Sequence, residues 1–496
     1  MDVLFITIDS LRRDVLGTYA DTPRFANYNI ETPNLDRFAQ RATVFDTHYA
    51  GSLPCMPQRR EFLCGIREFP WRPWGNAEPF DSTVPALASE AGAVTQLLTD
   101  HYHYLEYDGH GYYEPFDGFE MVRGHEYDSW KTAPREDPRL VAQCGADKKE
   151  RRLSYPRNTA SFDEFDETDF FAPKLFSALS KWLENNHDHD QWFCYTDSFD
   201  VHEPFHCPEP YASMYTDEDP RDPELSVWPP YSTVEESGYD ERELSFVRSQ
   251  FAGKVTMVDR WFGRVLDRLD ELSIWDDTMV VVTTDHGFSL GDHGWLAKNL
   301  GPVYQEIVQT PLFIWHPDNQ VDRVDALTSS VDVYSTLLEG LGVEQPDNTH
   351  GESLLPLVRG ETETHRSHAL YGYFGAGINV TDGQYTYLHP NRDGKAANCY
   401  STFQMPKSRG RAAQPDATVG SLPYTDVPVW KYRLDGQTQN EEPLLFDVSA
   451  DPEQTENLVE EEPEQLERMR DLLITGMQEL EVPNEQFQRL GLESER

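Results

Sequence analysis

Short apolar runs alternate with helical patterns along most of the chain, and this alternation limits the fold more than any other feature. The runs at 3–8, 94–98, 192–196, 279–284 and 312–315 consist mainly of β-branched, aromatic and other apolar residues. A strand that is apolar on both faces fits a parallel sheet that helices cover on both sides. We therefore predict an α/β protein with a large, mixed and mostly parallel sheet that lies between layers of helices.

The pattern changes after residue 365. Short runs at 370–374, 385–388 and 444–448 are typical of antiparallel strands. A final helix carries one apolar face, which is formed by Leu466, Met469, Leu473, Met477 and Leu480. The sequence thus predicts a main α/β domain at 1–365 and a smaller C-terminal α+β subdomain at 366–496, built on an antiparallel sheet and carrying that helix.

The charge of the chain excludes several classes of partner. Lys and Arg number 42 and Asp and Glu number 87, which gives a formal net charge of −45 at pH 7. Such a surface lacks the basic patch that nucleic acids need, and it repels an anionic membrane. Hydrophobic residues at 38% are enough for a packed core, so the acidity belongs to the surface. Excess carboxylate is typical of halophilic proteins, in which salt screens self-repulsion; an acidic mesophilic protein is the alternative.

The N-terminal apolar run, at 3–8, is too short for a signal peptide or a membrane span, and no later stretch is long enough. The six cysteines lie at positions 55, 64, 144, 194, 207 and 399, without a Cys-x-x-Cys pair. This spacing indicates neither a disulfide framework nor a structural zinc site. We expect a soluble, cytoplasmic protein with reduced thiols.

Polar side chains follow three of the predicted strands at the point where each strand ends. Asp9 follows the first strand, and Asp285 and His286 follow the fourth. Asp197 ends the third strand and leads towards His202. The carboxyl ends of parallel strands share one edge of the sheet, where α/β proteins bind their ligands. A single aspartate at a strand end is ordinarily a turn or helix-cap residue, but together these groups indicate a divalent cation site.

The segment at 53–65 contains a motif that is more specific than the strand-end residues. Cys55, Pro57 and Arg59 stand in the pattern Cys-x-Pro-x-Arg, which is followed by a short helical stretch and a glycine. This pattern resembles the signature of the sulfatases, in which the cysteine is oxidised after translation to formylglycine. The aldehyde hydrate is the nucleophile of that family: one hydroxyl attacks sulfur, and the second then expels sulfate. Pro57 and Arg59 fit a turn into a helix, whose N-terminal amides add positive potential beside the nucleophile.

Further segments resemble sulfatases in the same order along the chain. They lie at 31–36, 284–287, 291–294, 309–314, 332–338, 445–452 and 456–458. Several matches in one order are far more specific than a single motif. The resemblance implies an alkaline-phosphatase-like fold, with the catalytic domain at 1–365, and an enzyme that hydrolyses sulfuric esters.

The resemblance also implies one divalent metal ion, Ca²⁺ or Mn²⁺, held by Asp9, Ser10, Cys55, Asp285 and His286. Two of these positions depart from the family pattern. The family often has a second acid where Ser10 stands and an asparagine where His286 stands; phosphonate and phosphodiester hydrolases of the same superfamily have Asp-His. One carboxylate fewer and one imidazole more shift the preference from Ca²⁺ towards Mn²⁺, Zn²⁺ or Fe²⁺.

Three catalytic roles follow from the resemblance. Arg59 would hold the oxygens of the nucleophile. Lys298 would bind the sulfate group and the bridging oxygen. His202 would bind the substrate and protonate the leaving alcohol, an effect worth ~10²–10⁴ in rate.

The stretch at 99–104 stands where the family has Gly-Lys-Trp-His-Leu-Gly. By this alignment His103 would contact the nucleophile, and His101 would replace the family's substrate-binding lysine. A histidine is charged only near or below its pKa of ~6.5. We therefore expect sulfate binding that is weaker, or depends on pH, compared with a site that carries a lysine.

Three functions remain open. The first is a sulfatase that acts on a small-molecule or glycan sulfate ester, after a formylglycine-generating enzyme has bound transiently and modified Cys55. The second is a phosphonate or phosphodiester hydrolase on the same scaffold, which His286 favours. The third is a non-catalytic relative in which Cys55 stays unmodified. Aromatic residues at 102–119 and 192–215 either shape a pocket for a sugar or aryl group or pack as ordinary loops.

Overall fold

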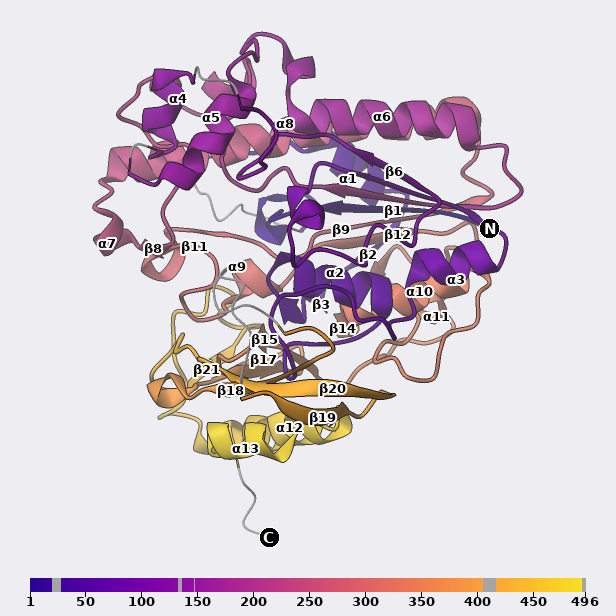
Figure 1. Cartoon of the computed structure of the whole chain (residues 1–496), viewed down its shortest axis with the longest axis vertical. Helices are drawn as coiled ribbons and strands as arrows, with labels where there is room; N and C mark the ends of the chain where they lie inside the picture. The colour runs from indigo at the N-terminus through magenta and orange to yellow at the C-terminus, as the bar shows by residue number, and fades with distance from the viewer. Residues whose placement is uncertain (20–27, 133–135, 147, 405–415, 493–496) are drawn as a thin grey trace.

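The computed structural model describes residues 1–19, 28–132, 136–146, 148–404 and 416–492 (Figure 1). Its central sheet has eight strands in the order β13-β2-β12-β9-β1-β7-β5-β6. Strands β9, β1, β7, β5 and β6 are parallel, whereas β12 runs antiparallel to both β9 and β2. The prediction of a large, mixed and mostly parallel sheet is therefore confirmed. The strands are β1 (Asp2–Ile8), β2 (Thr43–Phe45), β5 (Val94–Thr99), β6 (Gly118–Met121), β7 (Trp192–Ser198), β9 (Thr278–Thr283), β12 (Leu312–Trp315) and β13 (Arg323–Val324).

Helices cover both faces of this sheet, as Figure 1 shows. One layer contains α1 (Pro33–Ala39), α6 (Phe171–Asn186) and α8 (Glu241–Leu272). The other contains α2 (Cys55–Cys64), α3 (Val84–Glu90) and α10 (Val331–Leu341). Along β1, Leu4 and Ile6 pack in the core under the first layer, and Val3 and Phe5 pack under the second. Because alternate side chains enter two different cores, the strand is apolar at every position.

The C-terminal part of the chain forms a separate antiparallel sheet, as predicted, in the order β21-β17-β16-β15-β4. One member comes from far away in the sequence, because β4 pairs in parallel with β15. Only Pro54 separates β4 from Cys55, so the C-terminal sheet supports the strand that leads into helix α2. The elements are β4 (Ser52–Leu53), β15 (Ala369–Tyr373), β16 (Ile378–Thr381), β17 (Tyr385–His389), β21 (Leu444–Asp447) and α12 (Pro463–Glu479), which packs on β15, β16 and β17.

Smaller elements complete the fold. Within 100–170, the described residues include one strand, two short α-helices and three short 3-10 helices. The remaining elements are α4 (Pro138–Gln143), α5 (Ser154–Thr159), α7 (Val234–Ser237), α9 (Gln305–Val308), α11 (Leu355–Val358), α13 (Asn484–Leu490), β3 (His48–Tyr49), β8 (Ser232–Thr233), β10 (Ser289–Leu290), β11 (Trp295–Ala297), β14 (Thr328–Ser329), β18 (Ala397–Ser401), β19 (Thr418–Leu422) and β20 (Thr425–Leu434). Among the described residues, no helix is both long and apolar enough to cross a membrane.

Candidate active site

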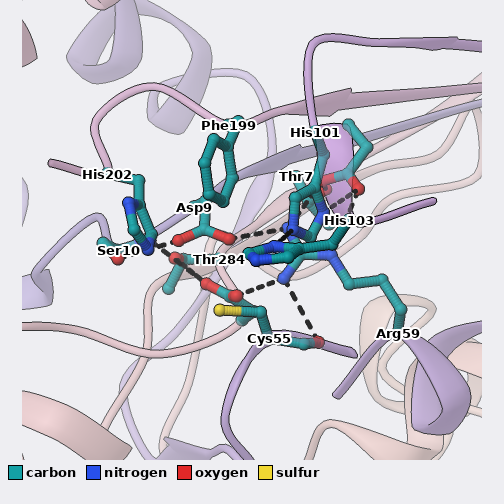
Figure 2. Close-up of polar contacts among 12 residues, drawn as sticks. Thr7, Asp9, Ser10, Cys55, Arg59, His101, His103, Phe199, His202 and Thr284 are labelled. Carbon is teal, nitrogen blue, oxygen red and sulfur yellow. Dashed lines mark hydrogen bonds and ion pairs between the residues drawn. The ribbon is translucent and has the colours of Figure 1, made fainter. Parts of the chain in front are cut away.

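Three adjacent strands and one helix bring the predicted polar residues together. Asp9 follows β1, and Asp285 and His286 follow β9. Asp197 is the second-last residue of β7, at the same edge of the sheet. Cys55 is the first residue of α2. All five side chains are buried, and Figure 2 shows Asp9 and Cys55 close to one another. The structure thus brings these residues together at one edge of the sheet, as the sequence predicted.

Four of the predicted metal ligands converge. One ligand atom from each of Asp9, Cys55, Asp285 and His286 lies within 4.8 Å of the others. Ser10, the fifth predicted ligand, has a left-handed backbone with φ of 61°. Its hydroxyl donates to Asp9 Oδ1 at 2.8 Å, and its amide donates to Asp285 Oδ1 at 3.1 Å. Ser10 therefore orients both carboxylates.

Without a bound cation, only one of the two carboxyl groups in this cluster ionises readily. Burial and repulsion from Asp285 raise the pKa of Asp9 well above its usual range. Burial also opposes the charge of Asp285, but Arg59 holds its pKa well below the usual range. Burial lowers the pKa of His286 to about 3, so its imidazole is neutral, the form that ligates metals. Two buried carboxylates and a neutral imidazole suit a divalent metal.

Arg59 connects the cluster to the helix that carries Cys55. Its Nη2 donates to Asp9 Oδ2 at 2.9 Å, and its Nη1 donates to Asp285 Oδ2 and, at 3.3 Å, to the backbone carbonyl of Cys55. Its Nε and Nη2 donate to the two oxygens of Asp197 at 3.1 and 2.8 Å. With no exposed surface, this guanidinium is the positive centre around which three carboxylates lie.

Asp197 is a site residue that sequence reasoning left unassigned. Besides Arg59, it accepts hydrogen bonds from Thr7 Oγ1 at 2.6 Å and from Tyr104 Oη at 2.7 Å, and its Oδ2 lies 3.2 Å from His101 Nδ1. Burial opposes its charge, but Arg59 holds its pKa well below the usual range. The available signal was its position at the end of β7, opposite Thr7 on β1. Asp197 fixes the guanidinium of Arg59.

Lys298 lies beside the thiol. Its Nζ lies 3.5 Å from Cys55 Sγ, 3.3 Å from Ser10 Oγ and 3.3 Å from His286 Nε2, and His286 Nε2 lies 3.3 Å from Cys55 Sγ. Burial and the charge of Asp9 raise the pKa of Cys55 well above its usual range. An unmodified thiol in this position therefore stays protonated and is a poor nucleophile.

The predicted histidines lie around the ring of Phe199. The ring of Phe199 stacks on His202 with centroids 4.1 Å apart and on His101 with centroids 4.4 Å apart (Figure 2). His101 Nε2 lies 2.8 Å from His103 Nδ1, and His103 Nε2 faces Glu126 Oε2 at 3.7 Å. His202 Nδ1 lies 2.8 Å from the backbone carbonyl of Glu203. The structure thus places His103 against His101, and its predicted contact with the nucleophile stays a prediction.

Comparison with known proteins identifies the family. A profile described as Sulfatase matches residues 1–343, more than two thirds of the chain. The chain belongs to the sulfatase family. This confirms the predicted family and, with it, the predicted enzyme class of sulfuric ester hydrolases.

Individual sulfatase relatives are distant but extensive. The multifunctional alkaline phosphatase superfamily protein PehA of Trinickia caryophylli is 26% identical over 92% of this chain and 91% of its own length. Choline-sulfatase of Rhizobium meliloti (strain 1021) is 27% identical over 78% of each chain. Among solved structures, the phosphonate monoester hydrolase of Agrobacterium radiobacter has a TM-score of 0.66 and 18% identity, covering 96% of this chain and 95% of its own. A protein solved with its substrate D-glucosamine-2-N,6-O-disulfate has a TM-score of 0.65 and 17% identity, covering 97% and 98%. These structures share the predicted alkaline-phosphatase-like fold.

Proposed function

We propose that this sulfatase hydrolyses sulfate esters with a formylglycine made from Cys55. One observation carries the proposal: a buried residue at the start of α2 lies within reach of Lys298 and of three metal-capable side chains. The raised pKa of Cys55 supports a modified nucleophile, because the thiol itself stays protonated. The aldehyde hydrate of formylglycine would supply two hydroxyl groups on one carbon. Conversion requires a formylglycine-generating enzyme as a transient partner.

Asp9, Asp285, His286 and residue 55 would hold one divalent metal, with Ser10 beside them. The metal would supply positive charge to a nucleophile that must approach an anionic ester. The donor set of two carboxylates and a neutral imidazole favours Mn²⁺ over Ca²⁺. Arg59 offsets part of the negative charge of the carboxylates, because its guanidinium contacts both Asp9 and Asp285.

The sulfate group would bind against Lys298. Burial opposes the charge of Lys298, but the carboxylates of Asp9 and Glu203 keep its pKa above the usual range, so the ammonium stays charged at neutral pH. Burial lowers the pKa of His101 to about 4, so His101 is neutral at pH 7 and cannot supply the charge of the family's lysine. The positive charge for binding the sulfate anion therefore comes from Lys298.

His202 would give its proton to the leaving alcohol. Burial and the charge of Lys298 lower the pKa of His202 in the free protein. The anion of a bound sulfate ester would offset Lys298 and favour the charged imidazole. His202 Nδ1 faces the carbonyl and, at 3.2 Å, a carboxylate oxygen of Glu203, which leaves Nε2 to act on the substrate.

We expect His202→Gln to slow the hydrolysis of phenyl sulfate by about 10²–10⁴-fold, because phenolate is a basic leaving group that needs a proton. Hydrolysis of 4-nitrophenyl sulfate, whose weakly basic leaving group departs without a proton, should fall far less. The measurement is kcat/KM for both esters as a function of pH. The wild-type rate on phenyl sulfate should fall as pH rises and His202 loses its proton, and the variant should lack that fall. Equal losses on both esters would remove His202 from the role of general acid.

The modification itself can be measured directly. Trypsin separates Cys55, on the peptide 42–59, from Cys64, on the peptide 61–67. In protein isolated from its native host we expect peptide 42–59 to be ~18 Da lighter than its sequence mass, because the thiol is replaced by an aldehyde oxygen. Peptide 61–67 is the internal control and should keep its sequence mass. An intact thiol at position 55 would leave the non-catalytic alternative.

The same preparation should be assayed on sulfate esters, phosphate diesters and phosphonate monoesters. We expect the highest kcat/KM on a sulfate ester. A modified protein that prefers a phosphonate would instead be a phosphonate hydrolase on this scaffold. Small-molecule and glycan sulfates are both candidate substrates; relatives include a choline-sulfatase and an N-acetylglucosamine-6-O-sulfatase.

The remaining predictions concern the setting of the enzyme. The net charge of −45 supports a protein adapted to high salt. All six cysteines are buried and unpaired, which supports a reducing compartment such as the cytoplasm. The division into domains at 1–365 and 366–496 agrees with the start of β15 at Ala369, and we keep it as a proposal.

A further inference from the structure

A second buried cluster contacts residues 199–204, which we call the His202 segment. Ligand atoms of Asp100, His125 and Asp200 approach within 4.8 Å of one another, as metal ligands would. The cation beside them is the ammonium of Lys254, which reaches in from α8 and lies 2.5 Å from Asp200 Oδ1. All four side chains are at most 1% exposed. They come from four separate stretches of the chain, so the cluster ties those stretches together.

Lys254 uses its three donors in a specific way. Besides Asp200, the ammonium donates to the backbone carbonyls of His202 and of Pro204, each at 2.9 Å. One of these carbonyls belongs to His202, the histidine that would protonate the leaving group, and the other lies two residues after it. A buried ammonium with three acceptors has no alternative arrangement nearby, because any movement would leave a charge or a carbonyl without a partner.

Asp200 fixes the other end of the same segment. Its Oδ2 accepts from the amide of Ala172 at 3.1 Å, near the start of α6, and its Oδ1 lies 2.9 Å from His125 Nε2. Burial opposes the charge of Asp200, but Lys254 holds its pKa below the usual range. Burial and Lys254 lower the pKa of His125 to about 4, so this imidazole is neutral and donates Nε2–H to the carboxylate. Lys254, Asp200 and His125 therefore contribute one positive charge, one negative charge and one neutral ring to the cluster.

We propose that Lys254, held by Asp200 and His125, positions His202 for proton transfer to the leaving group. The proposal rests on the function proposed above, in which His202 is the general acid. Lys254 reaches His202 only through the backbone carbonyl of that residue, so it is a positioning residue. Stacking of Phe199 on His202 fixes the plane of the imidazole ring. The hydrogen bond from Lys254 fixes the position of the His202 backbone. Displacement of a catalytic group by about 1 Å can cost about 10²-fold in rate.

The test compares Lys254→Met with wild type on phenyl sulfate and 4-nitrophenyl sulfate. The methionine side chain fills similar space but has neither charge nor donors. We expect kcat on phenyl sulfate to fall about 10²-fold, kcat on 4-nitrophenyl sulfate to fall less than about threefold, and KM to change little. Lys181→Met is the matched control, because the side chain of Lys181 is 65% exposed and pairs only with Glu184 among the ion pairs of the described residues.

Coupling through His202 gives a sharper result. In a His202→Gln background, Lys254→Met should cause no further change in the ratio of the two rates. If Lys254→Met does not yield folded protein, Asp200→Asn carries the test, because the amide keeps an acceptor and loses the charge; it should show the same dependence on leaving group at about tenfold. Equal losses on both esters, or an undiminished effect in the His202→Gln background, would overturn the positioning role alone. If the wild-type protein turns over neither of the two esters, both this inference and the proposed function are overturned.

Discussion

Cys55→Ala should abolish sulfate ester hydrolysis, with kcat falling by about 10⁶-fold, as expected when a covalent nucleophile is removed. Nothing else at the start of α2 can replace it. Met56 and Pro57 carry no nucleophilic group, and Lys298, although 3.5 Å away, is held in its charged form. The measurement is kcat on 4-nitrophenyl sulfate, with wild-type and variant protein produced in the same host.

The fold should survive this change. Removal of a single buried sulfur atom costs about 1 kcal/mol, a typical value for a point mutation. Cys64→Ala is the matched control, because Cys64 lies on the same helix and is equally buried but stands nine residues further from the site. It should keep wild-type kcat. Activity of Cys55→Ala within tenfold of wild type would rule out position 55 as the nucleophile.

The sequence was sufficient to predict the groups that stand at strand ends. Asp9 and Asp285 are easy to find, because parallel strands buried on both faces have a clear apolar signal and the next polar residue marks their shared edge. A helix at the Cys55 motif was predicted, but its start was not: α2 begins at Cys55, so Pro57 and Arg59 lie within the helix and not in a turn before it. These features are local: each depends on fewer than about a dozen consecutive residues.

The partners of those groups were harder to predict. Asp197 also ends a strand, but a single aspartate there is ordinarily a turn residue, and only the register of β7 with β1 places it against Arg59. Lys254 lies in the middle of a long amphipathic helix, where a lysine is normally exposed. Its acceptors lie about 50 residues earlier in the chain, and no sequence periodicity links the two. Strand β4, with two residues, is too short to give any pattern.

Asp285→Asn should remove the metal ion. Asp9 and Asp285 supply the two negative charges of the proposed ligand set, while Arg59 and Lys298 place two positive charges beside it. Loss of one carboxylate leaves the remaining ligands in a net positive environment, which repels a divalent cation. We expect metal content in the purified variant to fall below a tenth of the wild-type value, with turnover falling at least 10²-fold.

Thermal unfolding tests the same prediction without relying on activity. A metal that binds only the folded chain stabilises it by about 2.7 kcal/mol when present at 100 times its Kd. Added Mn²⁺ or Ca²⁺ should therefore raise the Tm of metal-stripped wild type but not of Asp285→Asn. The control is Asp276→Asn, because Asp276 is exposed and lies near the opposite end of the same strand, β9. A metal-dependent Tm in Asp285→Asn equal to that of wild type would place the metal elsewhere.

The two metals also separate the roles of the ligands. His286 contributes an imidazole, which Mn²⁺ accepts more readily than Ca²⁺, a cation that prefers oxygen ligands. Because burial keeps His286 neutral with a pKa of about 3, its ligating form is available throughout the neutral range and proton competition does not favour either metal. A larger Tm increase with Mn²⁺ than with Ca²⁺ at equal concentration would then report the imidazole directly. A larger increase with Ca²⁺ would mean that the oxygens of Asp9, Asp285 and Ser10 dominate the site.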